Sequence, residues 1–135
     1  MRYLLDTHIL IWALSGEEGL MPPEVAQMID APENEICFSS VSIWEVAIKN
    51  TVRPGQMGVK ADTLARLCGK AGIRELPMTS RHALTVTSLA RPDDAPTHKD
   101  PFDRMLIAQA KSEGMVLVTH DKKLKDYGEP CVMMV

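Results

Sequence analysis

The chain has 135 residues, a length that predicts one domain over residues 1–135, with an apolar core large enough to be stable without disulfides or structural metals. Its formal net charge is −3, from 18 acidic and 15 basic side chains, which argues against a general nucleic-acid coat protein because such proteins are plainly basic. The charge is unevenly spread: residues 1–48 sum to −7, residues 49–91 to +6 and residues 92–135 to −2. A basic middle between two acidic flanks needs an explanation.

The composition is that of an ordinary globular domain, with 45% apolar and 24% charged residues. The three cysteines, Cys37, Cys68 and Cys131, lie far apart and form no Cys-x-x-Cys pair. We therefore expect reduced thiols in a cytoplasmic protein and no zinc site. Because Asp6 and His8 interrupt the apolar run at the N-terminus, we also expect no signal peptide and no membrane span.

Strand and helix patterns alternate along the chain. In chain order, the sequence predicts a strand at 2–6, a helix through 9–13, a helix at 22–30, a strand at 35–39, a helix from 40 or 42 to 50, a loop at 53–58, a helix at 61–71, a strand at 73–76, a helix at 80–89, a loop at 91–101, a helix at 102–113, and strands at 115–119 and 131–135. This order predicts a three-layer α/β/α domain with a mostly parallel central sheet. In such sheets, ligands bind at the carboxyl ends of the strands.

Several carboxylates fall at those strand ends or at the helix starts that follow. Asp6 ends the first strand, Asp121 follows the strand at 115–119, and Glu45 lies in the first turns of a helix. Asp100 and Asp103 open another helix and share a face at i, i+3 spacing. Converging oxygen ligands suit Mg²⁺ or Mn²⁺ better than zinc. A cation would also relieve the repulsion among clustered negative charges.

Each of these acids also has a purely structural interpretation. Glu45 and Asp100 stand in the segments Ser-Val-Ser-Ile-Trp-Glu and Asp-Pro-Phe-Asp, whose spacing is typical of helix caps. Asp6 and Asp121 can equally cap the helices that follow them. The coincidence of several acids at strand ends favours a site over four separate caps. For Asp100, which precedes a proline, a cap is favoured over a metal ligand.

Four motifs, spread over nearly the whole chain, carry a family likeness through their order and spacing. They are Leu-Leu-Asp6-Thr-His, Ser-Val-Ser-Ile-Trp-Glu45-Val-Ala-Ile-Lys49, His98-Lys-Asp-Pro-Phe-Asp103-Arg-Met-Leu-Ile-Ala-Gln-Ala and Leu-Val-Thr119-His-Asp121. With these motifs the chain resembles the PIN-domain family and, within it, the VapC-type toxins of bacterial toxin–antitoxin pairs. The resemblance implies a PIN-like fold and a ribonuclease that depends on Mg²⁺ or Mn²⁺.

The resemblance also implies an acidic metal site made by Asp6, Glu45, Asp103 and Asp121. We expect Asp6, Asp103 and Asp121 to hold the ion directly or through water, and Glu45 to orient or deprotonate the attacking water or to serve as a further ligand. Attack by water predicts 5′-phosphate and 3′-hydroxyl ends. The implied partners are a small antitoxin, which exposed apolar surface on the early helices can receive, a second copy of the chain, and an RNA substrate such as transfer RNA.

Basic side chains near the acids are candidate contacts for RNA phosphates, with solvated surface as the alternative. These candidates are Arg104, Lys122, Lys123, Lys49 and Arg53. The basic middle as a whole is expected to form an RNA-facing rim, which adds Lys60, Arg66, Lys70 and Arg74.

Hydroxyl and ring side chains give weaker signals. Thr7 and Thr119 can donate hydrogen bonds within the site, with buried structural hydroxyls as the alternative. The four histidines show no ligand spacing, and only His120, beside Asp121, is singled out for testing. With 4% aromatic residues, a platform for stacking single strands is not expected. Trp12 and Trp44 are expected in the core.

Two other classes of protein would also gather acids at strand ends. A non-enzymatic, receiver-like α/β domain expects a paired acidic dipeptide after the first strand, where this chain has Asp6 alone. A nucleic-acid-binding module with a metal-binding acidic cluster but no catalysis is the other alternative. No G-x-G-x-x-G or P-loop motif supports a nucleotide enzyme. Without the four proposed catalytic acids the net charge would be +1, so the acidic total remains compatible with RNA binding.

Overall fold

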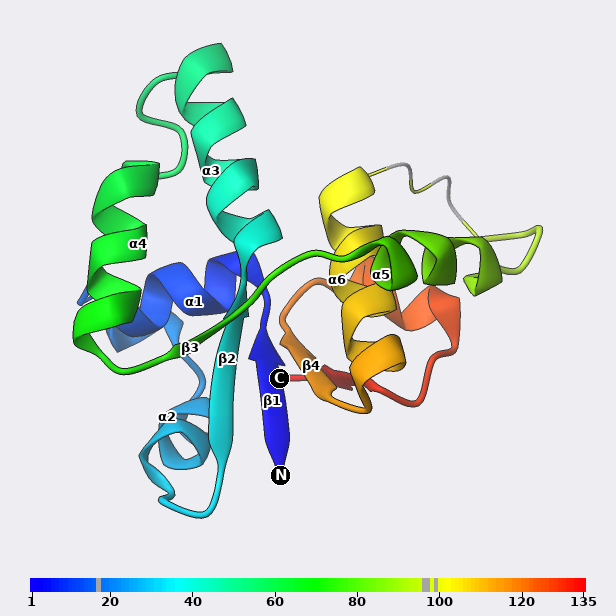
Figure 1. Cartoon of the computed structure of the whole chain (residues 1–135), viewed down its shortest axis with the longest axis horizontal. Helices are drawn as coiled ribbons and strands as arrows, with labels where there is room; N and C mark the ends of the chain where they lie inside the picture. The colour runs from blue at the N-terminus through cyan, green and yellow to red at the C-terminus, as the bar shows by residue number, and fades with distance from the viewer. Residues whose placement is uncertain (17, 96–97, 99) are drawn as a thin grey trace.

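The computed structural model describes residues 1–16, 18–95, 98 and 100–135, and these form a five-stranded parallel sheet with helices on both sides (Figure 1). The strands lie in the spatial order β3-β2-β1-β4-β5, and every neighbouring pair is parallel. Their bounds are β1 (Arg2–Leu5), β2 (Glu35–Ser39), β3 (Arg74–Leu76), β4 (Val116–Thr119) and β5 (Val132–Met134). All five strands predicted from the sequence are thus confirmed to within one residue at most ends.

The helices also follow the predicted order. They are α1 (Thr7–Leu14), α2 (Pro23–Asp30), α3 (Ser40–Val52), α4 (Ala61–Lys70), α5 (Ser80–Thr85) and α6 (Pro101–Glu113), with short 3-10 turns η1 (Glu18–Leu20), η2 (Val86–Ser88) and η3 (Lys122–Tyr127). The helix expected over residues 80–89 is divided into α5 and η2. The turns η1 and η3 have no counterpart among the elements predicted from the sequence.

Consecutive residues of the central strands point to opposite faces of the sheet. Leu4 and Leu117 belong to the cluster that packs against α6 and η3, whereas Leu5 and Val118 belong to the cluster that packs against α1, α2 and α4. Figure 1 shows these two sets of helices on the two sides of the strands. Because both faces are covered, the strands read as nearly continuous apolar runs. The three-layer α/β/α prediction is confirmed.

The prediction that Trp44 lies in the core is wrong. Its side chain is 52% exposed, and its ring meets that of Phe102 edge-on, with the ring centroids 4.9 Å apart. The reason is that α3 turns Ser42 and Glu45 inward, so apolar residues of the same helix fall on its outer side. Trp12 is half-buried and packs against the edge of the core.

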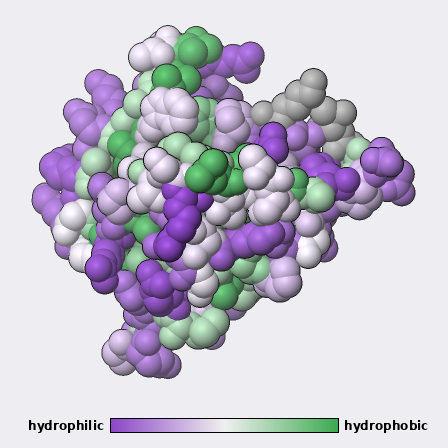
Figure 2. Space-filling model, turned by 45° about the vertical axis from the view of Figure 1, so that its right-hand side comes forward, coloured by the Kyte–Doolittle hydropathy of each residue, from purple (hydrophilic) through white to green (hydrophobic). Residues whose placement is uncertain are grey.

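The surface of the described part of the chain is mixed. Figure 2 shows small hydrophobic patches among hydrophilic side chains, one of them at the top, where α3 ends in Figure 1. In the predicted loop at 91–101, residues 96, 97 and 99 lie outside the described residues. Among the helices described, none has both the length and the apolar character needed to cross a membrane.

Candidate metal centre

A pocket of about 120 Å³ lies at the carboxyl ends of β1 and β4. The chain leaves β1 for β2 on one side and later returns to β4 on the other, so the strand order reverses at this point, where open parallel sheets bind ligands. The lining residues come from the ends of both strands and from three helices: Asp6, Thr7, His8, Glu45, Lys49, Asp100, Asp103 and Asp121. The structure therefore brings together all four acids expected in the site.

Asp6 both caps a helix and faces the pocket. One carboxylate oxygen, Oδ1, accepts the backbone N–H of Ile9 at 2.9 Å, which makes Asp6 the N-cap of α1. The other oxygen accepts the hydroxyl of Thr119 at the end of β4. Burial raises the pKa of Asp6, and these two hydrogen bonds oppose that shift. The structural and functional interpretations of Asp6 are thus compatible, because the residue that caps α1 also lines the pocket.

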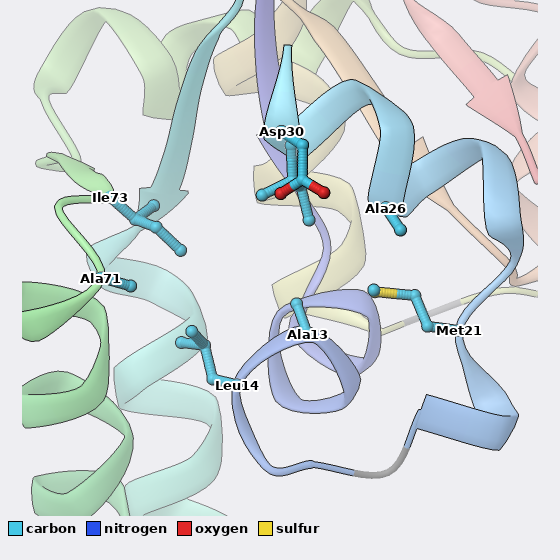
Figure 3. A pocket seen from close by; sticks show the side chains of 8 residues that line it. Ala13, Leu14, Met21, Ala26, Asp30, Ala71 and Ile73 are labelled. Carbon is cyan, nitrogen blue, oxygen red and sulfur yellow. The ribbon is translucent and has the colours of Figure 1, made fainter. Parts of the chain in front are cut away.

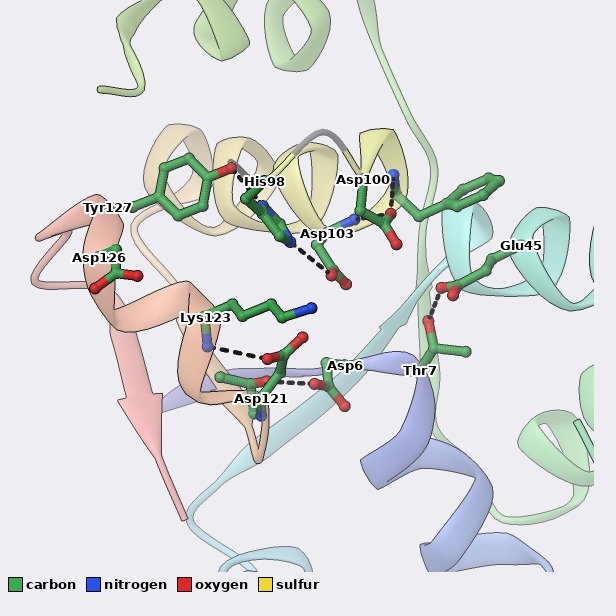
Figure 4. A network of polar contacts seen from close by, with 12 residues as sticks. Asp6, Thr7, Glu45, His98, Asp100, Asp103, Asp121, Lys123, Asp126 and Tyr127 are labelled. Carbon is green, nitrogen blue, oxygen red and sulfur yellow. Dashed lines mark hydrogen bonds and ion pairs between the residues drawn. The ribbon is translucent and has the colours of Figure 1, made fainter. Parts of the chain in front are cut away.

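Glu45 is held by two neighbours. Thr7 Oγ1 donates to its Oε1 at 2.7 Å (Figure 4) and also lies 2.9 Å from Ser42 Oγ. Lys49 Nζ donates to its Oε2 at 2.5 Å. Glu45 is only 3% exposed, so the ammonium of Lys49 offsets the cost of burying its charge. Burial alone would lower the pKa of Lys49, but the hydrogen bond and charge of Glu45 make the net shift upward. The donation by Thr7 that the sequence suggested is confirmed.

Asp103 lies in the first turn of α6, directly after the helix cap. Asp100 Oδ1 accepts the backbone N–H groups of Phe102 at 2.9 Å and Asp103 at 3.1 Å, so the cap predicted for Asp100 is confirmed. The cap fixes the start of α6 and thereby the direction in which the Asp103 side chain leaves the helix. Figure 4 shows Asp103 pointing from α6 toward Asp121 and Asp6.

The acids raise one another's affinity for protons. The pKa of Asp103 rises to about 8, with burial as the largest cause. Negative charge from the other acids of the pocket adds to the shift, in the order Asp100, Glu45, Asp121 and Asp6. A divalent cation among these carboxylates would remove this repulsion, and carboxylate oxygens are ligands that suit Mg²⁺ or Mn²⁺. The residues present therefore fit the ion that the sequence implied.

Thr119 and Asp121 lie at the carboxyl end of β4, where Thr119 contacts Asp6 at the end of β1. Thr119 Oγ1 donates to Asp6 and accepts the backbone N–H of Asp121 at 3.1 Å, which confirms its predicted hydrogen bond in the site. Asp121 Oδ1 accepts the backbone N–H of Lys123 at 3.0 Å and so caps η3. Figure 4 shows the Lys123 side chain reaching into the space between Asp103 and Asp121.

His98 also lies inside the cluster, although it was not among the site residues predicted from the sequence. Its Nε2 is 3.3 Å from Asp103 Oδ2 and its Nδ1 is 2.7 Å from Tyr127 Oη, and its side chain is 5% exposed. One ligand atom each from His98, Asp103 and Asp121 lie within 4.8 Å of one another, close enough to surround one ion. Burial, followed by the charge of Arg91, lowers the pKa of His98 and favours its neutral form. The only sequence signal was its place five residues before Asp103.

The candidate RNA-binding residues are spread more widely than the acids. Lys49 lines the pocket, Lys122 and Lys123 are exposed just after Asp121, and Arg104 follows Asp103 on α6. Arg53 is exposed at the far end of α3.

The basic middle does not form one rim around the pocket. Arg74 pairs with Glu35 at 3.0 Å, at the amino ends of the strands and thus at the opposite edge of the sheet. Lys70 ends α4 beside Ala71, which lines a different cavity. The expectation of a continuous rim is therefore wrong for these two residues, because α4 ends and β3 begins on the side of the sheet opposite the acids (Figure 1).

Relatives of the chain were found in sequence and in structure. It is 23% identical over 128 residues to the tRNA(fMet)-specific endonuclease VapC of Shigella flexneri, covering 91% of this chain and 89% of that protein. It is 26% identical over 127 residues to Ribonuclease VapC22 of Mycobacterium tuberculosis, covering 94% and 92%.

The fold is shared with a solved structure. VapBC2 from Rickettsia felis, bound to a DNA fragment from its promoter, matches with a TM-score of 0.69 at 17% identity over 100% of this chain and 98% of that one. A family model described as the PIN domain matches residues 3–130. Since that match covers most of β1, all of β2, β3 and β4, and the four acids, the chain belongs to the PIN domain family.

Proposed function

We propose that this chain is a metal-dependent endoribonuclease and the toxin of a toxin–antitoxin pair, with Mg²⁺ or Mn²⁺ as its ion. The observation that carries the proposal is the lining of one small pocket by Asp6, Glu45, Asp103 and Asp121 where the strand order reverses. The chain matches two relatives, named as an endonuclease and a ribonuclease, over most of their length, and this supports the proposed nuclease activity. The structural similarity to VapBC2 supports the proposed role as a toxin.

The proposed roles follow from the contacts of each acid. Asp6, Asp103 and Asp121 would hold the ion, directly or through water. A divalent cation bound there would supply polarisation of a phosphoryl oxygen and a lower pKa of water. Glu45 orients or deprotonates the attacking water, since Thr7 and Lys49 fix its carboxylate and each oxygen still has a lone pair to accept with. The products carry 5′-phosphate and 3′-hydroxyl ends.

RNA would reach this pocket past a few basic side chains. Lys49 and Lys123 are placed to meet phosphates next to the acids, and the proposal extends to Lys122, Arg104 and Arg53. Transfer RNA is the first substrate class to test, because one relative is named for cleaving it.

An apolar cavity on the early helices is the proposed seat of the antitoxin. The cavity, of about 270 Å³, lies between α1, α2 and the turn after α4 (Figure 3). It is lined by Ala13, Leu14, Met21, Ala26, Ile29, Asp30, Ala71 and Ile73. Apolar side chains from one face of an antitoxin helix fit such a lining, since helices bind grooves through an apolar stripe.

We also propose that two copies of the chain associate through α3. Its outer side presents Trp44, Ile48 and Val52, which are 52%, 41% and 69% exposed, at successive i+4 positions. A stripe of this kind can pack against its own copy across a two-fold axis. The three cysteines are free, which fits a reducing compartment, and the cytoplasm is the proposed location.

The test is cleavage of purified transfer RNA and total cellular RNA with Mg²⁺, with Mn²⁺ and with EDTA. The wild-type protein should cut RNA only with a divalent ion and leave ends that accept a 5′-adaptor without prior phosphorylation. Asp103→Asn should lower the rate about 100-fold or more, because it removes a charged oxygen from the site. Asp62→Asn, which makes the same change on the exposed start of α4, should cut like the wild type.

Two results would contradict the proposal. Cleavage by Asp103→Asn at the wild-type rate would remove the acids from the reaction. Ends with a 2′,3′-cyclic phosphate would show attack by the RNA's own 2′-hydroxyl instead of water. Binding of the ion and of RNA without any cleavage would leave the nucleic-acid-binding alternative.

A further inference from the structure

A second hollow adjoins the acidic pocket and shares its wall. It has a volume of about 250 Å³ and is lined by Asp6, His8, Trp12, His120 and Asp121. Asp6, His8 and Asp121 also line the acidic pocket. A group that occupies the hollow is therefore the immediate neighbour of whatever the acids hold.

Three aromatic rings gather around this hollow. The Trp12 ring lies 6.2 Å from that of His8, centroid to centroid, and 5.7 Å from that of His120, with interplanar angles of 55° and 68°. His8 and Trp12 stand at i, i+4 on α1, so they share one face of the helix, while His120 comes from the segment that follows β4. Residues distant in sequence thus build one aromatic wall.

The wall is held in place before any ligand arrives. Trp12 is half-buried and packs against the core cluster under α1. His120 Nδ1 lies 2.7 Å from the backbone oxygen of Val135, which fixes the ring at the edge of the sheet. Rings ordered in this way lose little conformational entropy when a flat group packs against them.

The chemistry of the lining selects the occupant. The carboxylates of Asp6 and Asp121 repel a phosphate, so the RNA backbone is not expected inside the hollow itself. An uncharged aromatic group meets no such repulsion, and nucleobases stack on tryptophan and histidine rings. We infer that this hollow binds one unpaired nucleobase of the RNA, next to the phosphate held at the acids, by stacking against Trp12 with His8 and His120 beside it.

The inference rests on the proposed ribonuclease and specifies how its substrate is positioned. The low aromatic content of the chain argued against a platform for stacking single strands, whereas the hollow gathers three rings around one site, enough for a single base. Because the base and the phosphate are neighbours on the same strand, the hollow makes the enzyme prefer an unpaired nucleotide at that position. The target would then be a loop or an unpaired end of the RNA.

The test pairs a protein variant with a substrate variant. An RNA oligonucleotide that the wild type cuts at one site is prepared with a single abasic residue at each position in turn. One abasic position beside the cut should raise KM about 5- to 150-fold, which is the loss expected for one stacked base, with a smaller change in kcat. Trp12→Ala should raise KM for the intact oligonucleotide by a similar factor and make the enzyme insensitive to that abasic position.

Matched variants separate stacking from folding. Trp12→Phe keeps a ring, so its KM should stay close to that of the wild type. His120 is exposed, so His120→Ala should raise KM and leave the Tm unchanged, whereas a substitution in the core would lower the Tm. Leu84→Ala removes an exposed apolar side chain from α5 and should leave both constants unchanged. A fall in kcat and Tm together, with KM unchanged, would overturn the inference in favour of a structural role.

A binding measurement gives a second readout without cleavage. In an Asp103→Asn, Trp44→Phe background, Trp12 is the only tryptophan of the chain, and its fluorescence should be quenched by the intact oligonucleotide and much less by the abasic one. Equal quenching by both, or equal abasic penalties in the wild type and Trp12→Ala, would overturn the inference while metal-dependent cleavage still stood. A wild-type protein that cuts no RNA would instead refute the proposed function.

Discussion

The carboxyl group of Asp103 shows how the clustered acids affect the stability of the folded chain. Its pKa of about 8 lies far above the ordinary value of 3.8, because burial and four neighbouring carboxylates disfavour its charge. The folded chain therefore binds this proton more tightly than the unfolded chain does. The stability that comes from the bound proton is fully present below pH 3.8 and is lost as the pH rises through 8.

The metal-free protein is thus expected to become less stable between about pH 4 and pH 8, by an amount on the order of a few kcal/mol. Mg²⁺ replaces the proton, so it should raise the Tm more at pH 8 than at pH 5. Thermal unfolding at both pH values, with Mg²⁺ and with EDTA, measures the two effects. Asp103→Asn should weaken both, whereas Asp62→Asn should not. A Mg²⁺ effect on Tm that is equal at both pH values would contradict this role of Asp103.

The site residues divide into those whose place in an element reveals them and those that only the fold brings in. Asp6, Glu45 and Asp121 could be predicted because a residue at a strand end or in the following helix must lie at the carboxyl edge of a parallel sheet. His98 could not, since it precedes α6 outside any helix or strand and has no periodic relation to Asp103. The aromatic wall depends on where β4 ends relative to α1, which no local pattern encodes.

At the scale of elements, α3 shows why the rule that apolar residues face inward failed. Its inner side carries Ser42 and Glu45 because that side ends at the acidic pocket. The contribution of α3 to the two core clusters comes from Val41 and Val46. The exposed side of α3 carries Trp44, Ile48 and Val52. The bounds of the helices were nevertheless predicted to within about two residues in most cases, since prolines, glycines and caps mark their ends.

An exposed apolar stripe on α3 leads to a prediction about association. Ile48→Asp places a charge in the middle of the stripe and should weaken self-association about 100-fold or more, because the charge would be buried without a partner in the dimer. Leu84→Asp makes the same kind of change on α5 and should leave association unchanged. Sedimentation velocity over a range of protein concentrations measures both. A dimer of Ile48→Asp as tight as that of the wild type would exclude α3 as the interface.

At the scale of the whole molecule, the charge gradient of the sequence does not become one basic face. Within the basic segment 49–91, Arg74 forms an ion pair with Glu35 at the amino edge of the sheet. Another part follows α4 away from the acids, as far as Lys70. Close to the pocket remain Lys49 and the lysines that follow Asp121. The electrostatic attraction for RNA should therefore come from a handful of side chains.

This distribution predicts a modest salt dependence of RNA binding. For single strands the slope of log K against log salt is about −0.7 per phosphate neutralised, so the five candidates Lys49, Arg53, Arg104, Lys122 and Lys123 set a limit of about −3.5. Replacing Lys122 and Lys123 together with alanine should make the slope shallower by about 1.4. Lys70→Ala should leave it unchanged, because its side chain lies at the far end of α4.

The measurement is fluorescence anisotropy of a labelled RNA oligonucleotide between about 50 and 300 mM KCl, a range over which counterion release is readily seen. The Asp103→Asn background keeps the RNA intact during the titration. If Lys70→Ala reduced the slope as much as the loss of one lysine beside Asp121, RNA would follow the whole basic middle across α4. The attraction would then belong to a long surface, and the restriction of RNA contacts to the neighbourhood of the acids would be wrong.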